Sequence, residues 1–334
     1  MPASAGILIG IISAIVLLAA LALLTAYICF RMAFYAPQKG SAMKCPVSVG
    51  EEVFDLPPDD IYVPFHEKMK EWAREVRSLP CEEFCVKSFD GLKLYGKYYE
   101  CEPGATIELM MHGYRGSAER DLCGGVQRSF ALGRNVLIID QRACGKSQGN
   151  VITFGVNESR DCLTWVNFLV EHFGKDVKII LTGISMGAST VMMAAARGVP
   201  SNVIGILADC GYSSQEKIIK KVIKDMKLPA NLLYPFVKMG SKIYGKFNID
   251  EISPLEAVGK ISLPIIFFHG EDDAYVPCEM SLENYEACKA PKRLVMVPEA
   301  GHGLAYPVLK GKYLDEVALF FTENGVPTSI RKEY

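Results

Sequence analysis

The stretch from Lys178 to Gly187 constrains the fold more than any other part of the chain. Residues 179–182 form a short run rich in β-branched side chains, which predicts a buried strand. Gly-Ile-Ser-Met-Gly follows at 183–187, and residues 188–196 are mostly small, which favours a closely packed helix. A strand, a sharp turn and a helix form the setting in which the serine of G-x-S-x-G becomes an exposed nucleophile. We therefore interpret Ser185 as a candidate nucleophile; the alternative is a chance match in a structural turn.

The run from Gly6 to Phe30 contains no charged residue and is long enough to span a bilayer. The alternative is a cleaved signal peptide, but no Lys or Arg precedes the run, which is also longer than a signal peptide's apolar core. We expect an uncleaved transmembrane helix over residues 6–30. Because Arg31, Lys39 and Lys44 follow it, the positive-inside rule predicts that the C-terminal domain faces the cytoplasm.

The remainder divides into a linker and one large domain. Residues 31–60 are irregular and include Pro57-Pro58-Asp59-Asp60, which predicts a surface linker. Residues 61–334 carry a helical pattern, a hairpin pattern and then apolar strands alternating with helices. That alternation predicts an α/β domain with a mostly parallel sheet covered by helices on both faces. The expected strands are 107–111, 134–140, 179–182, 203–208, 264–269 and 293–297, after a hairpin at 83–99; the expected helices include 64–79, 158–173 and 312–321.

The segment at about 213–250 interrupts the alternation. Its pattern is helical, it is rich in lysine, and residues 232–239 supply an apolar surface. Because it follows the serine and lies between two strands, we expect it to form a cap over the site. We interpret its lysines as a solvated helix face; attraction to an anionic lipid leaflet is the alternative.

Charge and cysteine content exclude several functions. The net charge of -2 gives no case for nucleic-acid binding. Eleven cysteines are scattered without a C-x-x-C pair, the closest two being Cys81 and Cys85, so neither a zinc site nor a disulfide scaffold is indicated. Free thiols used as small apolar side chains fit a reducing compartment.

A nucleophilic serine needs a general base, and the chain has five histidines. His302 lies in a glycine-flanked loop just after the last expected strand, from which it can reach a serine at the C-terminal edge of the sheet. His112 and His269 stand at or near strand ends and are rivals. His66 and His172 fall on expected helices, where a structural role is favoured.

The base in turn needs an orienting carboxylate. The loop after the strand at 264–269 offers Glu271, Asp272 and Asp273, and the chain order serine, acid, histidine is the order typical of this architecture. Spacing favours Asp273, whereas Asp272 is expected to point away. Asp209, after the preceding strand, is a second candidate.

Two backbone N–H groups are needed to stabilise an oxyanion. Met186, directly after the nucleophile, is expected to supply one. The loop of residues 112–116 follows the strand at 107–111 and is expected to supply the other, through Tyr114. In that arrangement His112 shapes the loop and transfers no proton.

Taken together, these residues resemble the Ser-dependent α/β-hydrolase superfamily, and within it the branch similar to serine aminopeptidases and monoacylglycerol lipases, particularly the membrane-anchored bacterial members. The family usually has D-x-R-G-x-G-x-S, and here Ala143 replaces the first glycine; we expect the turn to survive. The resemblance implies an eight-stranded sheet with a cap, and no metal or organic cofactor. The matching segments, from about residue 80 to 325, are His112-Gly113, Asp140–Gly149, Gly183–Gly187, His269–Pro277 and Gly301-His302-Gly303.

We predict a membrane-anchored serine hydrolase that cleaves carboxylic esters through an acyl-enzyme, with Ser185, Asp273 and His302 as its triad. The expected partners are a small-molecule ester or acyl substrate and the lipid bilayer. A thioesterase or a serine aminopeptidase could use the same triad. A non-catalytic, membrane-tethered binding protein on a hydrolase fold is the rival of another class. The acyl group, the alcohol and the oligomeric state are left open by the sequence.

Overall fold

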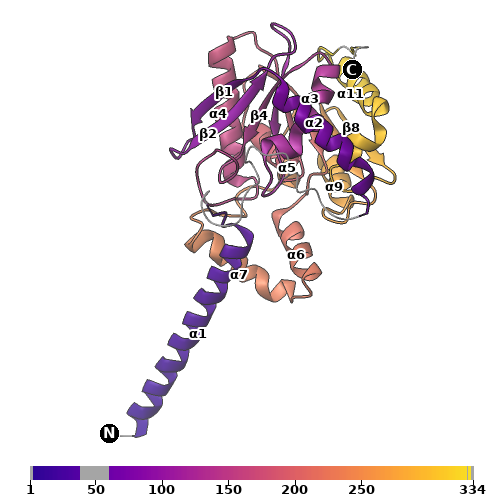
Figure 1. The fold of residues 1–334 in the computed structure, drawn as a ribbon. Helices are drawn as coiled ribbons and strands as arrows, with labels where there is room; N and C mark the ends of the chain where they lie inside the picture. Colours follow the sequence, from indigo (N-terminus) through magenta and orange to yellow (C-terminus); the bar gives the residue numbers. More distant parts are fainter. Residues whose placement is uncertain (1–2, 38–59, 329, 332–334) are drawn as a thin grey trace.

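The computed structural model describes residues 3–37, 60–328 and 330–331 (Figure 1). Most of the expected linker, residues 38–59, lies outside the described residues. The fold is built on one eight-stranded sheet with the order β1-β2-β4-β3-β5-β6-β7-β8. β2 pairs antiparallel with β1 and β4, and all other pairs are parallel. The predicted fold class is therefore confirmed. The strands are β1 Glu82–Lys87, β2 Lys93–Tyr99, β3 Ile107–Met111, β4 Asn135–Asp140, β5 Ile179–Ile184, β6 Val203–Asp209, β7 Ile265–Gly270 and β8 Lys292–Val297.

Helices cover both faces of the sheet (Figure 1). Successive side chains of a strand point to opposite faces, so in β5 Leu181 packs in the cluster that contains Trp165 of α4, whereas Ile180 packs in the cluster that contains Tyr313 of α11. Burial on both faces explains why the central strands are continuous apolar runs. The helices are α1 Ala3–Ala33, α2 His66–Ser78, α3 Ala118–Ala131, α4 Val156–Phe173, α5 Met186–Ala196, α6 Gln215–Asp225, α7 Ala230–Ile243, α8 Pro254–Val258, α9 Glu279–Ala287, α10 Ala305–Leu309 and α11 Gly311–Glu323, with a 3-10 turn, η1, at Val63–Phe65.

The segment between β6 and β7 is helical, as expected for a cap. The Ser214 side chain accepts a hydrogen bond from the Lys217 N–H and so begins α6. The buried face of α6, which includes Ile218, belongs to the same apolar cluster as Tyr234 of α7 and Met186 of α5. The inserted helices therefore belong to the same apolar cluster as Met186, the residue that follows the candidate nucleophile.

Helix α1 projects from the domain, and its stretch from Ile7 to Ala33 is long and apolar enough to cross a membrane (Figure 1). Its side chains are exposed from Ile7 to Leu21, whereas Ala26 and Phe30 are buried against the domain. A side chain on Gly240 of α7 would lie 2.5 Å from the Ala26 carbonyl oxygen, so only glycine allows this approach.

The chain immediately after α1 is also packed. Tyr35 forms an antiparallel bridge with Val151, and the Phe34 ring lies edge-on to Phe154 and Phe247 at 5.8 and 5.2 Å. Phe34 is fully buried. The helix thus continues three residues past the expected span, and the first residues of the expected linker are part of the domain's packing.

Candidate active site

Ser185 occupies the turn between β5 and α5 with a strained backbone. Its φ of 57° and ψ of −121° lie in a region that L-residues rarely adopt. Added side chains show why the flanking residues are glycines: a Cβ on Gly183 would lie 2.2 Å from the Gly187 carbonyl carbon, and a Cβ on Gly187 would lie 2.0 Å from the Met111 carbonyl oxygen. The close approach of α5 to β3 and β5 therefore fixes the turn that carries the serine.

The loop after β3 lies against this turn. A Cβ placed on Gly113 would be 3.5 Å from the Ser185 Cβ and 3.8 Å from its Oγ. His112, directly before, is fully buried, and both its ring nitrogens are occupied: Nε2 accepts from the Gln141 N–H at 3.0 Å, and Nδ1 donates to the Gly113 carbonyl at 2.8 Å. Since neither nitrogen is available to Ser185, His112 shapes the loop.

Asp273 and His302 are brought together from loops after β7 and β8. The His302 Nδ1 lies 2.6 Å from Asp273 Oδ2, while the other carboxylate oxygen, Oδ1, accepts from the N–H groups of Tyr275 and Val276 at 2.9 and 2.8 Å. Burial alone would raise the pKa of Asp273, but hydrogen bonds from His269 and His302, with the charge of His302, outweigh it and hold that pKa well below its usual range. The Asp273 carboxylate is therefore ionised in the folded protein near neutral pH.

The His302 loop lies against the nucleophile turn. A Cβ on Gly303 would be 3.0 Å from the Cδ1 of Ile184, the residue before Ser185. The His302 side chain is one-fifth exposed, whereas that of Asp273 is fully buried. A partly exposed imidazole that bonds a buried carboxylate, in a loop that lies against a serine turn, is a candidate general base.

These elements match known proteins. A model of the alpha/beta hydrolase fold matches residues 109–237. The esterase Pf2001 of Pyrococcus furiosus superposes with a TM-score of 0.62 and 26% identity, over 75% of this chain and 93% of the esterase. The chain belongs to the α/β-hydrolase superfamily. The resemblance seen in the sequence is thereby confirmed at the level of the superfamily.

Three sequence relatives of this chain are between 23% and 30% identical to it. "Uncharacterized protein YqkD" of Bacillus subtilis is 30% identical over 57% of this chain and 62% of its own length. Protein bem46 of Schizosaccharomyces pombe is 28% identical over 59% and 61%. The human alpha/beta hydrolase domain-containing protein 17B is 23% identical over 84% and 92%. The chain thus spans somewhat less than two thirds of the first two relatives.

His269, one of the rival bases, contacts the same carboxylate of the hydrolase site from the other side. Its Nε2 lies 2.8 Å from the Val276 carbonyl and 3.1 Å from Asp273 Oδ2, and its Nδ1 lies 2.6 Å from Ser281 Oγ. It is fully buried. His269 therefore fixes the Asp273 loop from within the sheet and presents no nitrogen to Ser185.

Asp209, the second candidate acid, directs its carboxylate to Tyr313 and not to His302. Its Oδ2 accepts from the Tyr313 hydroxyl at 3.3 Å, and its Oδ1 has no partner within the described part of the chain. Burial raises the pKa of Asp209 to about 6 against the opposing charges of His269, Arg128 and His302. Its main-chain carbonyl accepts from the Ser185 N–H at 2.8 Å, so Asp209 supports the turn through its backbone. Asp272 is exposed.

One group of side chains has metal-ligand character. Potential ligand atoms of Cys210, Asp273 and His302 lie within 4.8 Å of one another. Burial, with the nearby charges of Asp209 and Asp273, holds the pKa of Cys210 well above its usual value, whereas a metal binds the thiolate. Asp273 and His302 are also the candidate acid and base and are hydrogen-bonded to each other, so the group fits proton transfer better than metal binding.

The expected oxyanion loop is tied to helix α1 by its side chains. The Tyr114 hydroxyl donates to the Ala33 carbonyl at 2.8 Å, and Arg115 Nη2 donates to the carbonyls of Met32 and Tyr35 at 2.9 and 3.2 Å. The last carbonyls of a helix have no partner within the helix. The two side chains therefore satisfy the carbonyls of Met32 and Ala33 at the end of α1. No sequence pattern indicated this contact. Met186, the other expected donor, is buried at the first turn of α5.

The segment of residues 140–149 is a scaffold beside the site. Arg142 is buried and pairs with Asp161 of α4 at 2.6 Å and with Asp90 of the β1–β2 turn at 2.9 Å. Ala143, where the family has glycine, has φ 62°. The turn therefore survives with alanine in a left-handed conformation, at a cost of ~1 kcal/mol.

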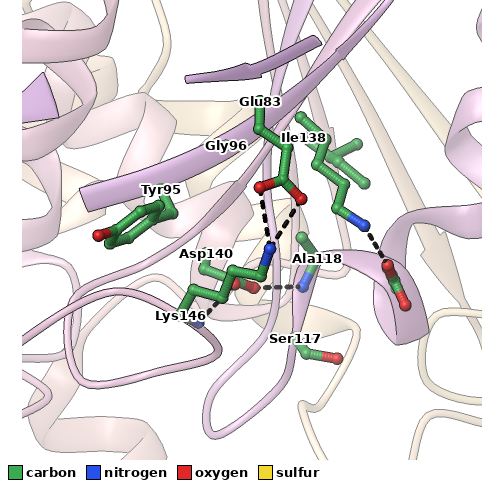
Figure 2. Close-up of a pocket in the computed structure, with 10 residues that line it drawn as sticks. Glu83, Tyr95, Gly96, Ser117, Ala118, Ile138, Asp140 and Lys146 are labelled. Carbon is green, nitrogen blue, oxygen red and sulfur yellow. Dashed lines mark hydrogen bonds and ion pairs between the residues drawn. The ribbon is translucent and has the colours of Figure 1, made fainter. Parts of the chain in front are cut away.

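A separate hollow lies among β1, β2, β4 and the start of α3 (Figure 2). Its charged groups satisfy one another: Lys146 pairs with Glu83 at 2.7 Å and Lys97 with Glu119 at 2.6 Å. Asp140 accepts from the Ala118 and Lys146 N–H groups. No predicted site residue lines it, and its paired charges make it a structural feature.

Proposed function

We propose that this hydrolase is a membrane-anchored serine hydrolase that cleaves carboxylic esters through an acyl-enzyme intermediate. The observation that carries the proposal is the short bond between His302 Nδ1 and Asp273 Oδ2 beside a serine held in a strained turn. Similarity to an esterase structure supports the reaction class.

Each residue has a definite role in the proposed reaction. Asp273 keeps the ring proton of His302 on Nδ1, which leaves Nε2 free to take the proton of Ser185 as the serine attacks the ester carbonyl. His302 then protonates the departing alcohol, and in the second half-reaction it activates water in the same way. The N–H groups of Met186 and Tyr114 stabilise the oxyanion.

The proposed substrate preference rests on the apolar cluster that contains Met186. The cluster also contains the aromatic side chains of Phe154, Tyr212 and Phe247, and an apolar environment beside the nucleophile favours an acyl chain. An aminopeptidase needs a carboxylate for the substrate's ammonium group. Every acid in the cap segment is paired with a lysine, namely Glu216 with Lys220, Asp225 with Lys221 and Asp250 with Lys238. Esterase activity is therefore favoured over aminopeptidase activity.

Helix α1 supplies the proposed membrane anchor, with the catalytic domain in the cytoplasm because Arg31, Lys39 and Lys44 follow the span. An impermeant maleimide should label the exposed thiols of Cys81 and Cys85 only after the cells are permeabilised. Labelling of intact cells would reverse the orientation.

The test of the reaction uses the full chain in detergent. A fluorophosphonate probe should label the wild type, and Ser185→Ala should abolish labelling and lower kcat for p-nitrophenyl butyrate by roughly 10⁶-fold. A matched Ser189→Ala variant changes a buried serine one turn along α5 whose Oγ bonds the Tyr212 carbonyl. It should keep the label. A folded wild type that neither labels nor hydrolyses esters would support the non-catalytic rival, whereas turnover of acyl thioesters alone would make it a thioesterase.

A further inference from the structure

The turn between α6 and α7 exposes large apolar side chains to solvent. Met226, Leu228 and Leu232 are 47%, 42% and 64% exposed. Met226 and Leu228 lie in the turn between α6 and α7, and Leu232 lies in the first turn of α7. This part of the chain forms the tip of the insertion (Figure 1). A group of exposed apolar side chains on a protein surface marks an interaction site for a protein, a ligand or a membrane.

The lysines of the insertion fall into two sets. One set is paired with acids: Lys217 with Glu283, Lys220 with Glu216, Lys221 with Asp225 and Lys238 with Asp250. The other set makes no ion pair with any acid in the described ranges, and its members are Lys224, Lys227, Lys242 and Lys246. Lys224 and Lys227 alternate with the exposed apolar residues. The tip therefore combines unneutralised positive charge with apolar side chains.

The position of the tip is set by the packing of α7 on α1. The Tyr244 hydroxyl donates to the Leu23 carbonyl at 3.1 Å, and the Tyr27 and Tyr244 rings meet edge-on at 5.2 Å. N-terminal to this contact, the residues of α1 are exposed from Ile7 to Leu21, and all of them except Ser13 are apolar. Figure 1 shows the α6–α7 turn on the side of the sheet from which α1 projects.

We propose that the α6–α7 turn docks onto the anionic lipid surface of the membrane that α1 crosses. Met226, Leu228 and Leu232 enter the headgroup region, and Lys224 and Lys227 lie at the lipid phosphates. Apolar side chains flanked by lysines bind such surfaces because lysine keeps its charge among the headgroups while its stem stays in the apolar layer. The docking rests on the proposed membrane anchor and is independent of the hydrolytic chemistry.

Docking has a consequence for the proposed substrate. The buried face of α6 and α7 packs in one cluster with Met186, beside the candidate nucleophile. A cap that is held on the lipid surface therefore places the site next to molecules that partition into the membrane. The ester substrate class that this arrangement favours is an amphiphile with its acyl chain in the bilayer.

The test measures contact between the tip and lipid in the full chain, reconstituted into vesicles. Leu232→Trp places a fluorophore at the tip, while the native Trp72 and Trp165 are buried and give a constant background. Leu319→Trp on α11, whose Leu319 is 52% exposed on a helix far from α1, is the control (Figure 1). In phosphatidylcholine vesicles with added phosphatidylserine and lipids brominated near the headgroup, tryptophan at 232 should be quenched and tryptophan at 319 should not. Equal quenching at the two positions would overturn the proposal.

Charge variants test the anionic surface. In the Leu232→Trp background, Lys224→Gln with Lys227→Gln should lower the docked fraction in phosphatidylserine vesicles, by about fivefold in the docking equilibrium for each lysine. Lys217→Gln, which removes a lysine already paired with Glu283, should leave quenching unchanged. Unchanged quenching in the double variant would rule out the lipid phosphates as partners. Hydrolysis of p-nitrophenyl butyrate in detergent is followed in parallel, because its absence would count against the proposed reaction and leave the docking result intact.

Discussion

Replacing Asp273 by Asn changes one atom and separates the roles proposed for this carboxylate. In the folded protein, N–H groups surround it on both sides. Oδ1 accepts from the Tyr275 and Val276 backbone, while Oδ2 faces His302 Nδ1 at 2.6 Å and His269 Nε2 at 3.1 Å. An amide has a single oxygen, so its NH2 group must face one of these two sides.

The energetics decide which side it faces. Turning the NH2 toward the two backbone N–H groups leaves fixed, buried donors without acceptors, at ~1–3 kcal/mol each. His302 can instead move its ring proton to Nε2 and accept the amide N–H at Nδ1, and His269 keeps the Val276 carbonyl as a partner. The amide oxygen therefore stays on the backbone side. His302 is then in the wrong tautomer to receive the serine proton, so kcat should fall by about 10⁴-fold, or ~5.5 kcal/mol.

The assay is kcat for p-nitrophenyl butyrate, with the thermal midpoint as a measure of folding. Asp272→Asn, which alters the exposed neighbour, should leave kcat within about twofold, in keeping with the small effects of most surface substitutions. Asp209→Asn should leave His302 in its active tautomer, because the Asp209 carboxylate bonds Tyr313 and not His302. Activity of folded Asp273→Asn within about tenfold of the wild type, or an equal loss in Asp209→Asn, would refute the reasoning.

Two further predictions concern stability. Glu108 is fully buried and lies 2.5 Å from both Arg128 and Arg134; burial would raise its pKa, but the two arginines outweigh this and lower the pKa to about 2. Glu108→Gln should therefore cost ~3–5 kcal/mol of unfolding free energy in urea titrations, because it leaves buried charge uncompensated. Since the folded pKa is lowered, the wild type's advantage over Glu108→Gln should be complete above pH 4.5 and should shrink as pH falls toward 2; an advantage that grows in acid would contradict this. Gly187→Ala forces a Cβ to 2.0 Å from the Met111 carbonyl oxygen, so it should destabilise by ~3 kcal/mol or more and abolish fluorophosphonate labelling. Gly311→Ala, with no atom within 4 Å of the added Cβ, is its control, and equal thermal midpoints for the two variants would show that the nucleophile turn tolerates a side chain.

The strands were predictable because their pattern is local. The strand expected at 107–111 is observed as Ile107–Met111, and the other expected strands shift by at most two residues at an end. Where helix boundaries moved, a side-chain contact decided them. α4 begins at Val156 because the Glu158 carboxylate accepts from the Gly155 and Thr153 N–H groups, which caps the helix before its apolar pattern starts.

Helix α3 was not predicted from the sequence because its own residues argue against a helix. Gly124 and Gly125 lie in its middle, and glycine costs ~1 kcal/mol each in a helix interior. The structure explains both: a Cβ on Gly124 would lie 3.0 Å from the Trp72 ring, and a Cβ on Gly125 would lie 3.0 Å from the Met110 sulfur. The close packing of α3 against α2 and β3 selects glycine at these two positions, so tertiary contacts override helix propensity.

The candidate site, like the fold, was only partly predictable from the sequence. Order along the chain was enough to propose that Asp273 and His302 meet, because both follow neighbouring parallel strands, and the structure places them 2.6 Å apart. It was not enough to show that His269 touches the same carboxylate, because that depends on the direction of a buried ring. The contact of Tyr114 with Ala33 joins residues 81 positions apart and has no local pattern.

The contact between Tyr114 and Ala33 bears on how a water-soluble form of this protein should be made. Trimming the protein back to the start of its sheet would strip Phe30 and Phe34 from the aromatic packing beside Phe154, and would leave the Tyr114 hydroxyl and the Arg115 guanidinium without their acceptor carbonyls. A shortened protein that begins near Ala22 would discard the exposed apolar half of the helix yet retain the half that contacts the loop. The last turns of the proposed anchor are therefore part of the packed α/β domain.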